Sequence, residues 1–195
     1  MNFSKKNNEY KKQINKIVSK TTILKTVLFI FALTLVNCTK NDDQDQLPPI
    51  TQTGANTFGA IVDGRVFIPK DKTGYYNPGG GRPKGISILR GTSYFSIAVS
   101  NYEDVYIYIY IPKNVPLETT YTFKLSDGNP ANGNEPHCFA VINNTGYLSY
   151  ENSGTIAFTK IDEIKGIIAG TFSLKMKNRN NENNIIEITD GRFDI

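Results

Sequence analysis

The sequence predicts an all-β fold, a single antiparallel β-sandwich or barrel-like domain of about ten strands. Three observations favour this class. Short runs rich in Ile, Val, Tyr, Phe and Thr recur through residues 57–195, and such side chains fit a pleated, half-buried surface. Turn pairs such as Asp63-Gly64 separate the runs. No stretch after the leader keeps an apolar period of 3.6 over three turns, so we expect no substantial helix.

The first element of the chain, residues 1–37, is a predicted lipoprotein signal peptide. An apolar run from Thr26 to Val36 follows a lysine-rich segment. The run is shorter than the roughly 20 residues of a spanning helix and matches the apolar core of a secretory signal, about 7 to 15 residues. It ends in Leu35-Val36-Asn37-Cys38, which resembles the bacterial lipoprotein box, in which the cysteine is acylated. The resemblance implies lipidation at Cys38 and an outer-membrane lipoprotein that is periplasmic or surface-exposed.

The second element, residues 38–56, is expected to be the lipidated cysteine and a flexible tether. It is polar, contains proline and lacks periodicity, so it cannot bury enough apolar surface to offset the entropy of ordering. Lys40 followed by Asp42, Asp43 and Asp45 also looks like the acidic signal that sends Bacteroidota lipoproteins to the cell surface. A solvated acidic linker is the alternative interpretation.

The net charge of +4 belongs to the leader rather than to the domain. Residues 1–37 hold seven lysines against one glutamate, whereas the chain from Cys38 onward has 15 Lys and Arg against 17 Asp and Glu. A mildly acidic mature chain gives no global argument for nucleic acid as a partner. The partners we expect are the membrane, reached through the N-terminal lipid, and a glycan, a small molecule or an envelope protein.

The third element, residues 57–195, is the β-sandwich or barrel domain itself. Its 139 residues can bury an independent core without disulfides. The strands that we expect are Thr57–Asp63, Arg65–Pro69, Gly85–Gly91, Tyr94–Ser100, Val105–Ile111, Thr119–Leu125, His137–Ile142, Gly154–Ile161, Gly166–Met176 and Ile185–Ile195, with turn residues in the Asn178–Asn184 cluster.

Asp-Gly-Arg occurs twice, at Asp63 and at Asp190, each time close before an aromatic residue. The simplest interpretation is two similar tight turns, since glycine tolerates positive φ. The opening Thr57-Phe-Gly-Ala-Ile-Val-Asp-Gly-Arg-Val-Phe-Ile-Pro69, together with the closing Gly170-Thr-Phe-Ser-Leu174 and Ile188-Thr-Asp-Gly-Arg-Phe-Asp-Ile195, resembles a family of Bacteroidota lipoproteins defined only as a domain of unknown function. That resemblance implies a β-rich exported domain and supplies no catalytic residues.

The residues indicate no catalytic set, no metal site and no cofactor. His137 directly precedes Cys138, and neighbours in a strand point to opposite faces, so they should not form a nucleophilic dyad. We expect Cys138 to be a small buried hydrophobe. One histidine and one free cysteine fall short of a zinc site. Asp162 and Glu163 lie between two expected strands and are predicted to solvate a turn. We therefore expect a protein that is not an enzyme.

Tyrosines at alternate positions of Val105–Ile111 make the one candidate ligand-binding surface. Val105, Ile107, Ile109 and Ile111 should face the core, and Tyr106, Tyr108 and Tyr110 the other side. If Tyr94–Ser100 pairs with this strand as a hairpin, Tyr94 and small hydroxylated residues join the tyrosines. Such a face could stack on a sugar or hold another flat ligand. Ordinary cross-strand pairing, or a face covered by a loop, is the alternative.

These features leave three functions from different classes. The first is a non-enzymatic binding module, anchored at the cell envelope, for a small molecule, a glycan or a protein partner. The second is a structural or accessory subunit of an envelope complex. The third is a hydrolase that depends on carboxylates, which would need two of them about 5 to 10 Å apart in a cleft.

Overall fold

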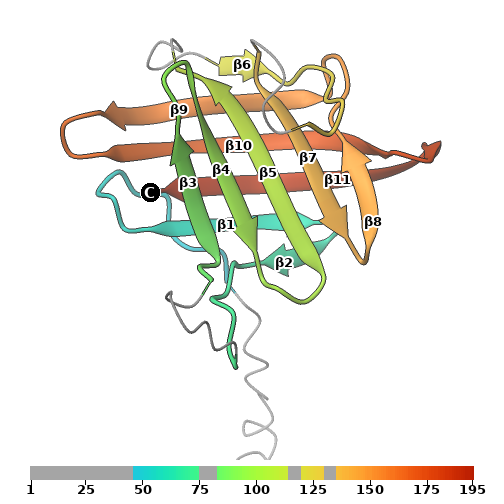
Figure 1. The fold of residues 1–195 in the computed structure, drawn as a ribbon, viewed down its shortest axis with the longest axis horizontal. Coiled ribbons are helices and arrows are strands. Elements are labelled where there is room, and N and C mark those ends of the chain that lie inside the picture. The colour runs from blue at the N-terminus through green and yellow to red at the C-terminus, as the bar shows by residue number, and fades with distance from the viewer. Residues whose placement is uncertain (1–45, 75–82, 114–119, 130–134) are drawn as a thin grey trace, which may run out of the picture. The chain divides into compact units, whose positions relative to one another are not determined.

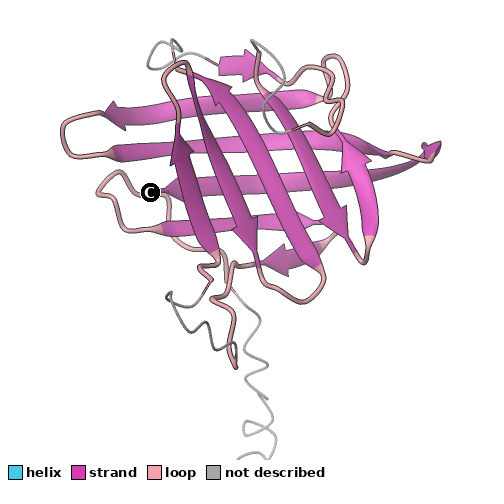
Figure 2. Cartoon of the chain, viewed as in Figure 1, coloured by secondary structure: helices cyan, strands magenta, loops and turns pink. Residues whose placement is uncertain are grey.

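The computed structural model describes residues 46–74, 83–113, 120–129 and 135–195, and these residues form strands and loops (Figure 2). The predicted signal peptide and Cys38 lie outside them. The strands are β1 (Thr57–Val62), β2 (Arg65–Phe67), β3 (Ile86–Arg90), β4 (Tyr94–Ser100), β5 (Val105–Pro112), β6 (Thr120–Thr122), β7 (His137–Ile142), β8 (Thr145–Leu148), β9 (Gly154–Asp162), β10 (Ile167–Asn178) and β11 (Asn181–Asp194).

All strand pairs are antiparallel and belong to one eleven-stranded sheet that folds over itself into two layers (Figure 1). The layer in front holds β3, β4, β5, β7 and β8, and the layer behind holds β2, β1, β11, β10, β9 and β6. Strand β10 joins the layers, because it pairs with β9 over Ile167–Leu174 and with β8 only at Lys177 and Asn178. The predicted all-β antiparallel class is confirmed, and the sheet is a folded sandwich that does not close into a barrel.

The core lies between the two layers. Ile107, Ile109 and Ile111 of β5 are fully buried, as their alternation predicts. From the other layer, Phe158 of β9 meets Phe95 of β4 edge to face, with ring centroids 5.9 Å apart. An aromatic pair of this geometry contributes about 0.5–1.5 kcal/mol beyond the area that it buries. Contacts of this kind hold one layer against the other.

Most strand predictions are confirmed, and those for β4 and β7 match at both ends. The prediction missed β8, which is only four residues long and is connected to β7 by Asn143 and Asn144, both at positive φ. Two such residues form the turn that suits a hairpin. The expected turn at Asn178–Asn184 is too long. Strand β10 continues to Asn178 and strand β11 begins at Asn181, so only residues 179 and 180 connect them.

The two Asp-Gly-Arg segments do different things, so the expectation of two similar turns is wrong for the second. Asp63 and Gly64 have φ of 49° and 77° and connect β1 to β2 as a tight turn. Asp190, with φ of 51°, lies inside β11. There, three residues of β11 span the distance of two residues of β10 and of β1, which is a β-bulge.

The last part of the predicted tether is folded rather than free, which corrects the boundary at residues 56 and 57. The compact unit includes residues 46–56 (Figure 1, cyan). Pro48 lies so close to strand β1 that a Cβ at Gly59 would be 2.5 Å from its Cδ. Composition alone missed this docking, because the contacts use backbone groups and a few side chains rather than an apolar run.

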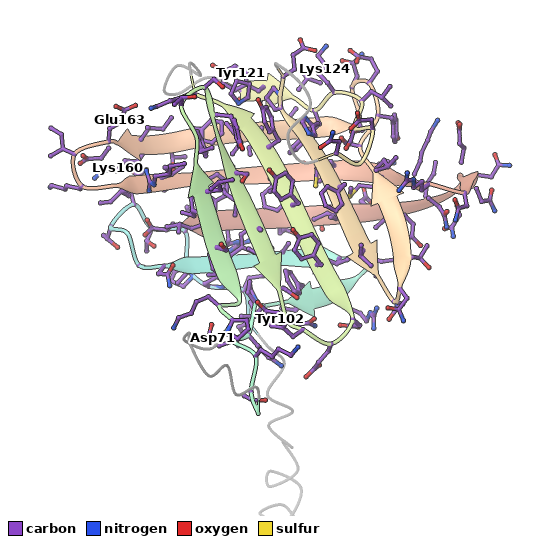
Figure 3. All side chains as sticks on the ribbon, in the orientation of Figure 1. Asp71, Tyr102, Tyr121, Lys124, Lys160 and Glu163 are labelled. Atoms are coloured by element: carbon purple, nitrogen blue, oxygen red, sulfur yellow. The ribbon has the colours of Figure 1, made fainter. Side chains whose placement is uncertain are left out.

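Polar side chains cover the two ends of the sandwich, with Tyr121 and Lys124 at one end and Asp71 and Tyr102 at the other (Figure 3). The Lys124 Nζ lies 2.6 Å from Glu151 Oε1. At the opposite end the Tyr102 hydroxyl donates a hydrogen bond to a backbone carbonyl in the β2–β3 connection, at 2.9 Å. Exposed contacts of this kind contribute little to stability, because water and dissolved salt screen them, so the packed layers rather than the ends stabilise the fold.

Candidate functional site

The predicted tyrosine face exists, and it includes more aromatic rings than expected. Hairpin pairing sets Tyr106, Tyr108 and Tyr110 opposite Ser100, Ala98 and Ser96, as predicted. The following strand in the layer, β7, adds His137 and Phe139 to the same face. In the sequence, these two rings alternate with small side chains in His137-Cys138-Phe139-Ala140. This alternation indicates a ring-bearing face, but only the pairing of β7 with β5 shows that the face is the one that holds the tyrosines.

The rings form two stacked groups. In the first, Tyr110 lies between Tyr94 and His137, with centroid distances of 5.0 and 4.6 Å and interplanar angles of 22° and 15°. In the second, Phe139 stacks on Tyr108 at 5.3 Å and lies tilted against Tyr106 at 5.7 Å. The groups span three strands, so their first effect is to hold β4, β5 and β7 together.

Burial divides the four tyrosines proposed as ligand contacts. Tyr108 and Tyr110 expose 6% and 4% of their surface, while Tyr94 and Tyr106 are half-buried. Burial raises the pKa of Tyr106, Tyr108 and Tyr110, and neighbouring tyrosines raise it further, while a hydrogen bond with Ser96 offsets part of the rise at Tyr108. The phenols therefore stay neutral at physiological pH. Only Tyr94 and Tyr106 offer much ring surface, and binding at this face stays a prediction.

His137 and Cys138 point to opposite faces of β7, so the expectation that they form no dyad is confirmed. Cys138 is fully buried in the core, and its burial raises the pKa of the thiol. His137 is 2% exposed, and its Nδ1 donates to the Glu135 carbonyl oxygen at 3.1 Å. Its Nε2 has no hydrogen-bond partner, counting the part of the chain that the structure describes.

A hollow of about 320 Å³ lies on the outer face of the layer behind, the face turned away from the viewer in Figure 1. Ser173 of β10 faces Thr155 of β9, and Thr171 lies between Ala157 and Arg192 on its two neighbouring strands. The small side chain of Ala157 leaves room beside the hydroxyls of Thr155, Thr171 and Ser173. We call this site the hydroxyl hollow, and its described lining is Ile50, Thr120, Thr155, Ala157, Thr171, Phe172, Ser173, Asp190, Gly191 and Arg192.

The β-bulge brings two charged side chains to the hydroxyl hollow. Ile188 faces the core, and in a regular strand Asp190 and Arg192 would face it too. The extra residue at Asp190 reverses the alternation, so that Gly191 and Phe193 face inward and the two charged residues face outward. A Cβ at position 191 would lie 2.4 Å from the ring of Phe172, which explains the glycine. The second Asp-Gly-Arg segment therefore forms a bulge that orients the side chains of Asp190 and Arg192 toward the hydroxyl hollow.

The two charges at the hydroxyl hollow balance each other and are already partly engaged. Arg192 Nη2 lies 4.0 Å from Asp190 Oδ1, and its Nε donates to the backbone carbonyl of Asp190 at 3.1 Å. Its Nη1 donates to the Pro48 carbonyl oxygen at 3.4 Å. The arrangement therefore presents hydrogen-bonding groups of both kinds without a net charge.

The tether end that borders the hydroxyl hollow is held by a buried carboxylate at the end of β11. Asp194 is 1% exposed, and its oxygens accept hydrogen bonds from Thr51 Oγ1 at 2.6 Å, Thr53 N at 2.9 Å and Gly54 N at 2.7 Å. Burial alone would raise the pKa of Asp194. The hydrogen bonds from Thr51, Thr53, Gly54 and Ala55 outweigh burial and lower the pKa from 3.8 to about 2.

The other polar groups that the structure describes offer fewer contacts to a ligand. A second hollow of about 110 Å³ between the β1–β2 hairpin and the β4–β5 turn is bridged by Arg65 and Asp104, 3.8 Å apart. Asp162 accepts a hydrogen bond from the Lys165 backbone at 2.9 Å, which confirms its part in the turn.

Among the residues described, no three His, Cys, Asp or Glu side chains gather closely enough to hold a metal ion. Nor do residues 46–74, 83–113, 120–129 and 135–195 contain a helix long and apolar enough to cross a membrane.

Fold and hollow together define an all-β sandwich domain with a polar, hydroxyl-lined depression on one outer face. No protein-family model, no curated protein and no solved structure matches the chain. The resemblance to Bacteroidota lipoproteins through residues 57–69, 170–174 and 188–195 stays a prediction.

Proposed function

We propose that the chain is an exported, membrane-anchored lipoprotein whose β domain is a non-enzymatic binding module of the cell envelope. The lipoprotein box at Cys38 supports the anchor, and a lipoprotein of this kind lies in the outer membrane, facing the periplasm or the cell surface. A processed lipoprotein cysteine carries more than one acyl chain, and two chains hold a protein stably where one holds it marginally. The ligand is a small molecule, a glycan or a segment of a protein partner.

The hydroxyl hollow is the observation that carries the binding role. Small-molecule sites are concave, with volumes of about 300–1,000 Å³, and contain a few well-placed polar groups. The hydroxyl hollow has this size, and its polar groups stand on the rigid strands β9, β10 and β11. Its described lining includes one carboxylate, Asp190, where glycoside hydrolases use a pair. Binding is thus the role that the hollow supports best.

Membrane fractionation tests the anchor. The full chain and its Cys38→Ala variant are expressed in a bacterium of the predicted phylum and labelled with a radioactive fatty acid. We expect the parent chain to carry label and to sediment with the outer membrane. The variant should carry no label and be released or remain at the precursor mass. A variant that stays on the membrane at the processed mass contradicts the proposal.

Thermal denaturation tests the binding role. The purified full chain in detergent is heated in the presence of a library of small metabolites and glycans, because a ligand that binds only the folded state raises Tm. We expect at least one compound to raise Tm in proportion to the logarithm of its concentration. If none does, and one envelope protein is crosslinked in cells at the β-sandwich, the small-molecule and glycan forms of the proposal fail, and the domain binds a protein partner or is an accessory subunit.

A further inference from the structure

We propose that the hydroxyl hollow binds a carbohydrate and that Ile50, from the membrane-proximal tether, forms one wall of this site. The inference rests on the binding role proposed above and names its ligand class. It also gives the tether a second role, since a residue from its last, docked part then contacts the ligand. Three features of the site carry it: the polar groups, the exposed apolar wall and the way in which that wall is fixed.

The polar groups fit a polyol. Each hydroxyl of Thr155, Thr171 and Ser173 can both donate and accept hydrogen bonds, as can each hydroxyl of a sugar. Asp190 adds an acceptor, and Arg192 adds planar donors. The groups come from adjacent strands, so they lie in a grid whose neighbours are about 5 Å apart across strands. Such a grid can contact successive hydroxyls of one ring.

The apolar wall fits the other side of a sugar, whose C–H groups need a contact that is not polar. Ile50 is 58% exposed and lies beside the hydroxyl hollow. An exposed isoleucine at the rim of a polar hollow gains when a ligand covers it, at roughly 25 cal/mol for each Å² of apolar surface removed from water. Hydroxyl floor and apolar rim together match the two kinds of surface of a carbohydrate ring.

The wall is fixed because the tether is held on both sides of Ile50. Before it, the Pro48 carbonyl accepts a hydrogen bond from Arg192 at 3.4 Å. After it, Thr51 and Gly54 donate to Asp194 at 2.6 and 2.7 Å. Asp194 and Arg192 both belong to β11, the strand that also brings Asp190 to the hollow. Ligand binding and docking of the tether therefore stabilise each other, as any two events linked through one contact must.

The test compares two pairs of matched variants of the full chain in detergent. Thr171→Val removes a hollow hydroxyl, and Thr159→Val makes the same change on β9 outside the described lining. Ile50→Ser removes the wall, and Ile164→Ser makes the same change at a fully exposed turn. A glycan array carrying mono-, oligo- and polysaccharides selects the ligand. Isothermal titration calorimetry then measures its Kd with each variant, using both the monosaccharide and the polymer that contains it.

We expect the array to give at least one ligand, and Thr171→Val to weaken it about fivefold, the loss of one hydrogen bond worth about 1 kcal/mol. Ile50→Ser should weaken it several-fold, and the two control variants should bind like the parent. Equal Kd values per site for monosaccharide and polymer would identify a free sugar as the ligand, and a much tighter polymer would identify a glycan chain.

Three results would overturn the inference, and the first two leave the proposed function standing. If a ligand from the metabolite library raises Tm but no glycan binds, the module binds but not carbohydrate. If a glycan binds with equal strength to Thr171→Val and Ile50→Ser, the binding role stands and the hollow is not the site. If neither library nor array gives a ligand, the inference fails, and the binding role fails for small molecules and glycans.

Discussion

The side chains of Thr51 and Asp194 lie 2.6 Å apart although 143 residues separate them in the chain. The hydrogen bond connects the segment after the predicted anchor to the last residue of the final strand. Asp194 is buried, and its carboxylate accepts bonds from two backbone N–H groups as well. The start and the end of the folded unit are therefore held by one charged group.

Asp194→Asn should lower the free energy of unfolding by about 2 kcal/mol, because an amide group would place donors against donors where a charged acceptor now lies. Urea denaturation followed by tyrosine fluorescence measures the change. Asp190→Asn is the matched control, since Asp190 is exposed and should cost less than about 0.5 kcal/mol. Equal losses in both variants would show that the tether end is not held by Asp194.

The same carboxylate predicts how stability depends on pH. The pKa of Asp194 is lowered to about 2 in the folded protein, against 3.8 for the free group. A lowered pKa means that the stabilisation is fully present above 3.8 and is lost as the pH falls through 2. Urea midpoints recorded from pH 5 to pH 2 should therefore decline more steeply for the parent chain than for Asp194→Asn. Parallel curves would contradict the assignment.

Periodicity could predict the strands because side chains at alternate positions face the core, even where burial itself does not alternate, as at Tyr108 and Tyr110 on the outer face of β5. In β5 each isoleucine at alternate positions is buried in the core, so the pattern alone defined the strand and its inner face. Strand β8 was missed because its four residues are too few to show a pattern and its turn uses Asn143 and Asn144 rather than a glycine. The docking of residues 46–56 was missed because long-range hydrogen bonds to one aspartate leave no periodic signal.

Gly191→Ala tests the β-bulge at Asp190, which the Asp-Gly-Arg pattern predicted to be a tight turn. The new Cβ would lie 2.4 Å from the ring of Phe172, which is buried in the core and cannot move freely. Overpacking of this kind costs about 1–3 kcal/mol. The second change Phe172→Leu should recover part of that loss, and a double-mutant cycle by urea denaturation should give a coupling of at least about 0.5 kcal/mol. Strictly additive losses would mean that the ring does not limit position 191.

The candidate site was less predictable than the fold, for a physical reason. The tyrosine face is visible in the sequence, since Tyr106, Tyr108 and Tyr110 alternate with isoleucines. The hydroxyl hollow is not, because it depends on which strands are neighbours and on a bulge that turns Asp190 and Arg192 outward. The face of a strand on which each side chain lies can be predicted from the local sequence. Strand order and bulges cannot, because they arise from pairing between segments that are distant in the chain.

Tyr110→Thr separates packing from binding at the tyrosine face. The ring of Tyr110 lies between Tyr94 and His137 and is 4% exposed, so its removal should cost about 2–3 kcal/mol in urea denaturation. Tyr94→Thr, at the half-buried outer end of the same stack, should cost about half as much. Equal costs would contradict the stacking. Threonine suits a strand, so neither variant should prevent folding.

The double variant Tyr94→Thr/Tyr106→Thr then tests the tyrosines as ligand contacts, because it removes the two of the four tyrosines that keep exposed surface. If the ligand lies in the hydroxyl hollow, on the opposite outer face of the sandwich, glycan binding should be unchanged in this variant and weakened in Thr171→Val. The reverse pattern would move the ligand to the tyrosine face. The two surfaces belong to different layers, so a loss at one should leave the other intact.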